Sequence, residues 1–292
     1  MNASRVCAIT GVSGYVGSVL AAALAGEMQV IGLSRRPADT TAVQWEYGSD
    51  RDITPELRNR KVDVLIHAAW DMRTSSLKQL RRICVDGSRR LYGMAREAGV
   101  KRIIFISTIS AFQGCRSAYG RSKVEVERLT QAMGGIVLRA GLVFGPHSGG
   151  SFGTIREQVR KNSFVPVIGS GLAPQYLLHE HTLADIVLRA AAGEMDCFDG
   201  DPIVLAHPQP WPFRDLVLRI AQAEHRKVTI VPTPWRLLYA GLRSAEALHL
   251  NLPIRSDSVI SFVHQNPAPD FSGLTKCKIA PLPFALGDRR EG

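Results

Sequence analysis

The chain has 292 residues, of which 45% are hydrophobic and 21% charged, an ordinary composition for a globular protein with a sizeable core. The formal net charge is +10, but the basic residues are scattered in short runs without interleaved aromatic residues, which argues against a nucleic-acid partner. No apolar stretch is long enough to span a bilayer and no signal-peptide layout is present, so we expect a cytoplasmic protein without a membrane partner.

The cysteines and histidines indicate neither a disulfide framework nor a metal site. The five cysteines, at positions 7, 84, 115, 197 and 277, are far apart and show no CxxC or Cys/His spacing. His179 and His181 have no acid or thiol placed to complete a ligand set. We expect reduced thiols, which fit the cytosol.

In chain order, short apolar runs alternate with amphipathic stretches over the first two-thirds of the chain, which is typical of an α/β fold with a doubly wound parallel sheet. The apolar runs predict strands over residues 6–10, 30–33, 63–67, 102–107, 135–139 and 203–206, with another near Tyr47. The amphipathic stretches predict helices over residues 15–25, 76–98, 118–133 and 183–192.

From Gly141 onward, glycine, proline and loop residues become frequent, and we expect a smaller, substrate-binding lobe to begin there. The sequence predicts a sheet-forming core over residues 1–165, rejoined by about 177–206, and a lobe mainly over 166–292. Residues 212–224 and 235–250 are the predicted helices of that lobe, and residues 266–292 are poorly patterned.

A glycine-rich turn follows the first predicted strand and opens the first predicted helix. Glycines at this point let the backbone approach a pyrophosphate, and the free N–H groups at the helix start can donate to it. The position therefore predicts a Rossmann fold that binds a dinucleotide, the alternative being a tight turn without ligand. The expected cofactor contacts are Gly11, Ser13, Gly14, Tyr15, Val16 and Gly17.

The second predicted strand is followed by Ser34, Arg35 and Arg36, with no acid at its tip. An arginine fork matches the 2′-phosphate of NADP, whereas an NAD site usually places an acid here, so NADP is favoured and NAD is the alternative. Both arginines are otherwise ordinary surface charges. Asp50 is a candidate acceptor for the adenine amine, or a turn residue.

The predicted strand over residues 63–67 runs into His67, Ala68 and Ala69, whose last two side chains are small enough for a dinucleotide to lie close to the backbone. We count all three as cofactor-binding, although the His67 side chain itself is expected to be a satisfied structural histidine. Trp70 follows directly and is expected either to line the substrate pocket or to pack.

Tyr119 and Lys123 are the most specific catalytic signal, because residues four apart on a helix lie on the same face. A lysine ammonium and a positive nicotinamide ring would lower the pKa of the phenol from about 10, making it an acid/base. Ser107, Thr108 and Ser110 lie at the carboxyl end of a predicted strand, the edge where α/β sheets bind ligands.

Together these motifs resemble those of the extended short-chain dehydrogenases/reductases, in the NAD-dependent epimerase/dehydratase family. The matching segments are residues 10–17, 67–69, 107–108, 119–123, 138–146 and 177–184. The resemblance implies that Tyr119 is the acid/base, Lys123 the ribose anchor and Thr108 the hydroxyl that polarises the substrate. It also implies a nucleotide-sugar-like substrate and a homodimer. Further expected contacts are Ser107, Ala140, Gly141 and Val143 to the cofactor, and Trp70, Ser110 and Arg139 to the substrate.

Two departures from the family pattern bear on the reaction. Cys84 stands where members usually carry an asparagine, and a thiol cannot replace the donor and acceptor of an amide. Ile109 and Ser110 follow Thr108 where family dehydratases carry an Asp-Glu pair, which disfavours dehydration.

The sequence therefore predicts an NAD(P)-dependent oxidoreductase acting on a keto or hydroxyl group. A nucleotide-sugar epimerase that retains NAD would use the same residues and is the alternative. A non-catalytic dinucleotide-binding sensor or assembly protein is the alternative of another class. Such a protein would keep the glycine turn but would not need Tyr119 and Lys123.

Overall fold

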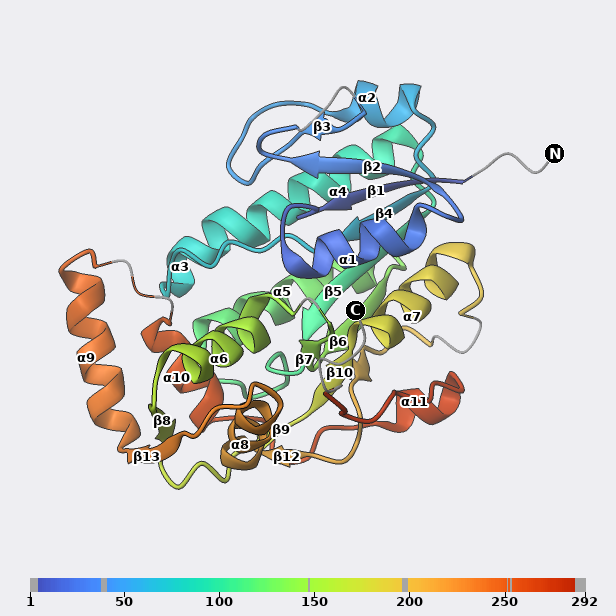
Figure 1. Ribbon diagram of the computed structural model, residues 1–292. Helices are drawn as coiled ribbons and strands as arrows, with labels where there is room; N and C mark the ends of the chain where they lie inside the picture. Colours follow the sequence, from blue (N-terminus) through green and yellow to red (C-terminus); the bar gives the residue numbers. More distant parts are fainter. Residues whose placement is uncertain are drawn as a thin grey trace.

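The computed structural model describes residues 5–37, 41–146, 148–195, 199–250, 252 and 254–286. Its centre is a seven-stranded, all-parallel sheet in the order β11-β6-β5-β4-β1-β2-β3 (Figure 1), which confirms the predicted Rossmann-type α/β fold. The strands are β1 (Val6–Thr10), β2 (Gln29–Ser34), β3 (Val43–Gln44), β4 (Val64–His67), β5 (Arg102–Thr108), β6 (Ile136–Ala140) and β11 (Ile203–Leu205).

Helices cover both faces of this sheet, with α1 (Tyr15–Leu24) and α7 (Glu180–Ala192) in front of it and α4 (Asp86–Ala98) and α5 (Ala118–Ala132) behind it in Figure 1. Successive strand residues point to opposite faces, so Cys7 and Ile9 of β1 join the core under α1 and α7, whereas Ala8 joins the core on the other face. Burial on both faces explains the nearly continuous apolar runs in the strands.

The helix predicted over residues 76–98 is interrupted by a π-helical turn. It consists of α3 (Leu77–Leu80), the π turn η1 (Arg81–Val85) and α4. The glycine next to this turn has a packing role, because a Cβ on Gly87 would lie 2.4 Å from the ring of Tyr47. A short helix that the sequence did not predict, α2 (Thr54–Asn59), packs on the same face of the sheet as α4.

The smaller lobe is built on three short strand pairs. β7 (Leu142–Phe144) pairs with β10 (Leu177–His179), β8 (Phe164–Ile168) with β13 (Thr229–Thr233), and β9 (Pro174–Gln175) with β12 (Trp211–Pro212). The helices of the second half of the chain, besides α7, are α6 (Gly150–Lys161), α8 (Phe213–Ala223), α9 (Trp235–Ala247), α10 (Ser256–Val263) and α11 (Ser272–Lys276). Of these, α11 packs on β11 of the main sheet rather than in the smaller lobe.

α6 was not predicted, and its packing bears on the predicted division at residue 165. Phe152 and Val159 of α6 join Phe144 and Leu216 in the separate core of the smaller lobe. α6 therefore packs with that lobe, although the sequence-based division placed it with the Rossmann core. The chain returns to the main sheet through α7 and β11, near where a return was expected.

In the described part of the chain, no helix is both long and apolar enough to cross a membrane. Cys7, Cys84 and Cys115 are free thiols. Cys277, however, is disulfide-bonded, so the expectation of reduced thiols throughout is wrong at this position.

A buried ion pair joins α5 to strands β5 and β6. Glu127 is almost completely buried and accepts hydrogen bonds from Arg139 Nε at 2.9 Å and Arg139 Nη2 at 2.6 Å. The Ser107 hydroxyl donates to the same carboxylate at 2.5 Å. Because a buried charge must be paired, these three side chains fix how the helix that carries Tyr119 lies on the sheet.

We predict that Glu127→Ala destabilises the fold by about 3–5 kcal/mol, because it leaves the Arg139 guanidinium partly buried and unpaired. Chemical denaturation of the purified protein measures this. The double variant Glu127→Leu/Arg139→Met removes both charges and should lose much less stability. A loss below about 1 kcal/mol in Glu127→Ala would contradict the structural role of the pair.

Candidate active site

The glycine turn between β1 and α1 forms a cradle that side chains would fill. Gly11 has φ +77°, and a Cβ there would lie 2.9 Å from Cα and N of Ala69. A Cβ on Gly17 would lie 2.1 Å from the Gly11 carbonyl oxygen. Gly14 is the N-cap of α1 and offers no side chain to the first N–H groups of the helix. These groups and the positive end of the helix dipole fit a pyrophosphate.

Tyr15 connects this turn to the start of α7. Its hydroxyl donates to the carboxylate of Glu180, and burial raises the pKa of Tyr15. A Cβ on Gly149 would lie 2.9 Å from Cβ of Tyr15, so the glycine loop before α6 packs directly on this side chain. The backbone of Tyr15, rather than its ring, is therefore the group available to a phosphate.

The His67 side chain is the centre of a buried hydrogen-bond network. Thr10 Oγ1 accepts the N–H groups of Ala68 at 3.1 Å and Ala69 at 3.0 Å, so its own proton is donated to His67 Nδ1 at 2.8 Å. His67 Nε2 then carries the ring proton and faces Ser88 Oγ at 2.8 Å and Tyr47 Oη at 3.0 Å.

This network gives His67 a structural role in holding the strand ends. The Tyr47 hydroxyl donates to the Ala69 carbonyl at 3.0 Å, and burial lowers the pKa of His67 to about 3. The imidazole is therefore neutral and its side chain is committed within the protein. The groups left available to a ligand at this point are the backbone atoms of Ala68 and Ala69, whose position Thr10 and Tyr47 fix.

Lys123 is buried under aromatic rings beside Tyr119, with a side chain pointing to the end of β5. Its ammonium donates to the Ile106 carbonyl at 2.8 Å and lies 4.2 Å from the ring centroid of Trp70 and 4.6 Å from that of Phe105. Among the described residues, no carboxylate lies within ion-pair distance of it. Burial lowers the pKa of Lys123 to about 7.

Tyr119 is one helical turn from Lys123, whose ammonium lies 5.9 Å from the centroid of its ring. The Trp70 ring packs against it edge to face at 6.0 Å. Burial raises the pKa of Tyr119 to about 12, and a hydrogen-bonding interaction with the Thr108 side chain acts in the opposite direction. The structure thus brings Tyr119, Lys123 and Thr108 together. The expected lowering of the phenol pKa depends on a positive nicotinamide ring as well as on the lysine, and it stays a prediction.

Asp257 of α10 caps the helix that carries Tyr119, and sequence reasoning missed it. Its two carboxylate oxygens accept the N–H groups of Ala118 at 2.7 Å and Tyr119 at 2.8 Å. Ser117 accepts the N–H of Gly120 at 3.0 Å and completes the cap. Asp257 lies 138 residues from Tyr119 in sequence, so no local motif signals this contact.

Cys84, which stands at the usual asparagine position, lies in the π turn η1 and is completely buried. Burial raises the pKa of its thiol to about 11, so it is neutral at physiological pH. Its carbonyl accepts the Ser88 hydroxyl at 2.6 Å, which joins η1 to the His67 network.

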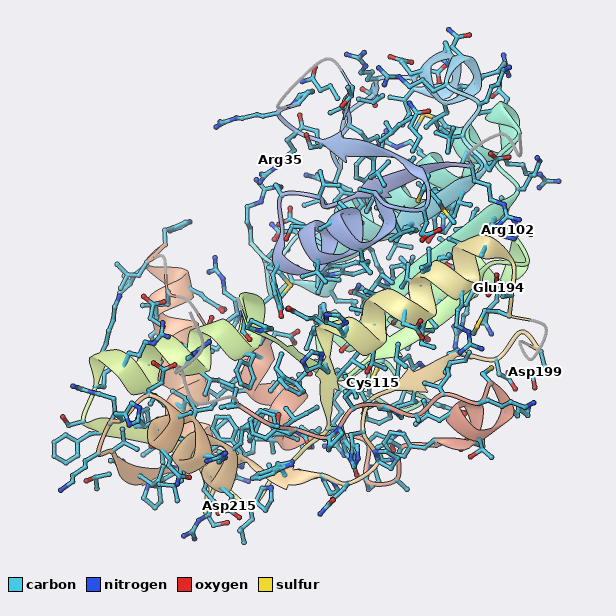
Figure 2. All side chains as sticks on the ribbon, turned by 45° about the vertical axis from the view of Figure 1, so that its right-hand side comes forward. Arg35, Arg102, Cys115, Glu194, Asp199 and Asp215 are labelled. Carbon is cyan, nitrogen blue, oxygen red and sulfur yellow. The ribbon has the colours of Figure 1, made fainter. Side chains whose placement is uncertain are left out.

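Arg35 and Arg36 are exposed just after β2, and Figure 2 marks Arg35 at the margin of the Rossmann core. Among the described residues, neither guanidinium has an ion-pair partner. Ser34 is the last residue of β2 and is partly buried. Two unpaired guanidiniums after this strand are available to a phosphate group.

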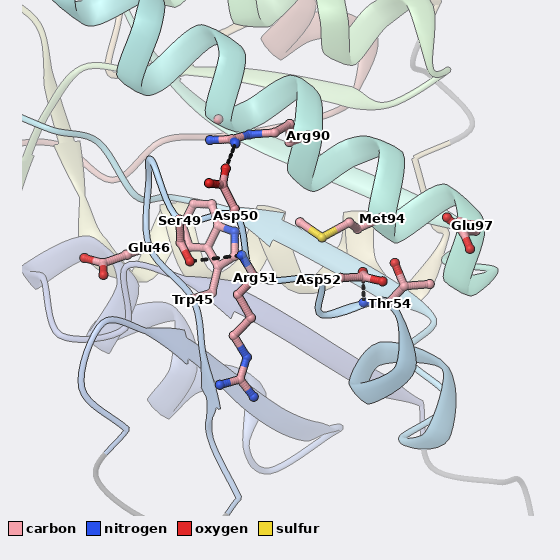
Figure 3. A pocket seen from close by; sticks show the side chains of 11 residues that line it. Trp45, Glu46, Ser49, Asp50, Arg51, Asp52, Thr54, Arg90, Met94 and Glu97 are labelled. Atoms are coloured by element: carbon pink, nitrogen blue, oxygen red, sulfur yellow. Dashed lines mark hydrogen bonds and ion pairs between the residues drawn. The ribbon is translucent and has the colours of Figure 1, made fainter.

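Asp50 is highly exposed and its carboxylate pairs with Arg90 of α4 at 2.9 Å, as Figure 3 shows. Both residues line a hollow of about 340 Å³ with Trp45, Asp52 and Met94. This hollow shares no lining residue with the glycine turn or with Tyr119 and Lys123. A contact between Asp50 and adenine stays a prediction.

Other predicted contacts differ in whether their side chains are available. Arg139 and Ser107 are committed to Glu127, which argues against Arg139 as a substrate ligand. Gly141 is packed tightly, since a Cβ there would lie 2.4 Å from the Tyr176 carbonyl oxygen. Ala140 is buried. The remaining predicted residues are partly or fully exposed at the glycine turn and the strand ends, and they are Ser13, Val16, Ser110 and Val143.

A family model matches most of the chain. The NAD dependent epimerase/dehydratase family matches residues 7–196, which contain the glycine turn, Thr108, Tyr119 and Lys123. The chain belongs to this family. Membership supports an enzyme that uses a nicotinamide cofactor, and it confirms the resemblance stated from the motifs.

Two bacterial proteins are similar to this chain in sequence. An uncharacterized protein, y4nL, of Sinorhizobium fredii is 25% identical over 81% of this chain and 78% of that protein. A ceramide reductase of Caulobacter vibrioides is 27% identical over 57% of this chain and 55% of that protein, so this match spans about half of the reductase.

Solved structures share the fold of this family member. MoeE5 in complex with UDP-glucuronic acid and NAD superposes with a TM-score of 0.72 at 16% identity, over 96% of this chain and 95% of that one. The UDP-glucose 4-epimerase of Thermotoga maritima with UDP-glucose gives 0.68 at 17% identity, over 79% and 86% of the two chains. These likenesses establish the architecture.

Proposed function

We propose that the chain is an NADP-dependent reductase that converts a ketone to an alcohol, with Tyr119 as the proton donor. The observation that carries the proposal is the group formed by Tyr119, Thr108 and the buried Lys123 at the carboxyl edge of β5. This edge is where open α/β sheets bind ligands. A nucleotide-sugar-like substrate fits the bound ligands of MoeE5 and the epimerase.

The residues of the glycine turn fit the cofactor. Gly11, Gly14 and Gly17 leave room for a pyrophosphate. Lys123, one helical turn from Tyr119, would hold the ribose next to the nicotinamide. Bound NADPH would supply a hydride to the carbonyl carbon. Trp70 packs on both Lys123 and Tyr119 and shields them from water, which strengthens their electrostatic effect.

The protonation state of Tyr119 suits a proton donor. A pKa of about 12 keeps the phenol protonated at neutral pH, so it is ready to donate to the substrate oxygen as charge develops there. The Thr108 hydroxyl can donate a second hydrogen bond to that oxygen.

Reduction is also favoured over dehydration. Dehydration needs a further acid and base, but the carboxylates near Tyr119 in the described chain are engaged, Glu127 by Arg139 and Asp257 by backbone N–H groups. The name of the similar ceramide reductase also agrees with a reductive reaction.

That the chain forms a homodimer stays a prediction.

Tyr119→Phe should lower kcat about 10²–10⁴-fold, because it removes only the proton donor. The measurement is NADPH oxidation with a panel of keto-sugar nucleotides and simple ketones, together with NADPH binding, which should remain nearly unchanged. Tyr176→Phe is the matched control, since that ring packs on Phe271 outside this group and should keep its activity. An unchanged kcat in Tyr119→Phe would contradict the assignment of Tyr119 as the proton donor. A nicotinamide that stays bound through purification would favour the epimerase instead.

Arg35→Glu/Arg36→Glu should weaken NADPH binding about 10–100-fold while NADH binding changes little, because only NADPH carries the 2′-phosphate. Titration of each nucleotide by fluorescence measures both affinities. Arg96→Glu, at an exposed position near the end of α4, is a control for net charge. Equal losses for both nucleotides, or no loss for NADPH, would contradict the NADP assignment.

A further inference from the structure

The segment from α9 toward α10 exposes an unusual concentration of large apolar side chains. Of the eleven such side chains that are exposed in the described part of the chain, five lie between residues 237 and 254. They are Leu237 at 70% exposure, Leu248 at 71%, Leu250 at 52%, Leu252 at 38% and Ile254 at 43%. Exposed apolar clusters of this kind mark interaction sites.

On α9 the exposed residues form one face. Leu237, Gly241, Ser244 and Leu248 follow each other at helical spacing and are all exposed. The opposite face is the one that packs, with Leu242 buried and α10 alongside. Figure 1 shows α9 at the edge of the molecule, away from the central sheet. We call Leu237, Leu248, Leu250, Leu252 and Ile254, with the α9 residues between them, the α9 surface.

The charges around the α9 surface are positive. Arg236 and Arg243 lie on one flank of the apolar face and are exposed, and Arg255 follows the last exposed apolar residue. Between residues 226 and 269 the sequence contains two acids, Glu246 and Asp257. Both are turned into the protein, so the outward charge of this segment comes from arginine.

Hydrogen bonds hold these two acids inward. Glu246 accepts from the Ser256 N–H at 2.8 Å and from the hydroxyls of Ser256 and Ser75 at 2.9 Å each. Arg243 approaches Glu246 at 3.4 Å but keeps 56% of its side chain exposed. Asp257 is bound to the N-terminus of α5.

We propose that the α9 surface docks on an anionic lipid bilayer as a peripheral contact. Leucine side chains on one helical face fit the boundary between head groups and acyl chains, and flanking arginines fit lipid phosphates. A second copy of the chain fits less well, because a two-fold contact pairs the same surface on both chains and would therefore bring two positively charged surfaces together. The sequence analysis expected no membrane partner because the chain lacks a spanning segment. A peripheral contact needs no such segment.

The inner side of the same segment contacts the proposed active site. Asp257 caps the helix of Tyr119, and Glu246 binds Ser75 in the loop that follows Trp70. Docking therefore places α10, which packs on both α9 and α5, between the lipid surface and the helix of Tyr119. The proposal stands independently of the redox reaction, since vesicle binding needs neither cofactor nor substrate.

The test is flotation of the full chain with vesicles of phosphatidylcholine alone and of phosphatidylcholine mixed with phosphatidylglycerol. We expect at least about tenfold stronger binding to the mixed vesicles, weakened by added salt. Leu237→Asp/Leu248→Asp should reduce this binding at least about tenfold, and Arg236→Glu about fivefold. Leu172→Asp, at a leucine that is 61% exposed outside the α9 surface, should bind like the wild type.

Circular dichroism and thermal unfolding of each variant verify that it is folded, which is expected because the substituted side chains are exposed. No binding by the wild type, equal binding to both vesicle types, or unchanged binding by Leu237→Asp/Leu248→Asp overturns the proposal. Light scattering supplies a further outcome. A wild-type dimer that becomes a monomer in the same double variant assigns the surface to a second copy and also overturns it.

Discussion

The site depends on one unusual interaction, a lysine ammonium buried without a carboxylate partner in the described chain. Lys123 is held by a single carbonyl, that of Ile106, and by the faces of Trp70 and Phe105. A buried cation is costly unless something replaces its hydration, and a carbonyl and two aromatic rings replace it only in part. This explains why the pKa of Lys123 falls to about 7.

Much of the surrounding structure serves to hold the two ends of this arrangement. Thr10, His67 and Tyr47 fix the backbone at the ends of β1 and β4, where the dinucleotide is proposed to lie. On the other side, the Glu127 ion pair seats α5 on the sheet, and Asp257 caps its first turn. These polar groups are buried and satisfied, so they can specify one geometry rather than merely add stability.

The parts of the fold that follow from local sequence patterns could be predicted. Each motif of the site is local in the sequence and can be recognised there. The motifs follow each other as the glycine turn, the strand end with its hydroxyls, and then Tyr119 with Lys123. The parallel sheet follows from the apolar runs of its strands. The contacts of Asp257 and Glu127 depend on tertiary packing between distant segments, so no periodicity reveals them. α6 was missed because Gly149, Gly150 and Gly153 weaken the helical signal, although Gly149 is needed to pack on Tyr15. The packing of Trp70 and Phe105 on Lys123 was not predictable either, because it joins residues from different segments. The same holds for the burial that raises the pKa of Tyr119.

The most direct test of the buried ammonium is the pH dependence of unfolding in Lys123→Met compared with the wild type. Because the pKa of Lys123 is about 7 in the folded protein and about 10.4 when unfolded, the unfolded wild type binds more protons between these values. Wild-type stability therefore rises through this range relative to the variant. The free energy of unfolding of Lys123→Met should exceed that of the wild type by the largest amount below pH 7. This difference should fall by about 2–4 kcal/mol by pH 10. Lys276→Met is the control, since Asp199 raises the pKa of that lysine and no narrowing is expected. A difference for Lys123→Met that stays constant from pH 6 to pH 10 would contradict burial of the charge and the site built around it.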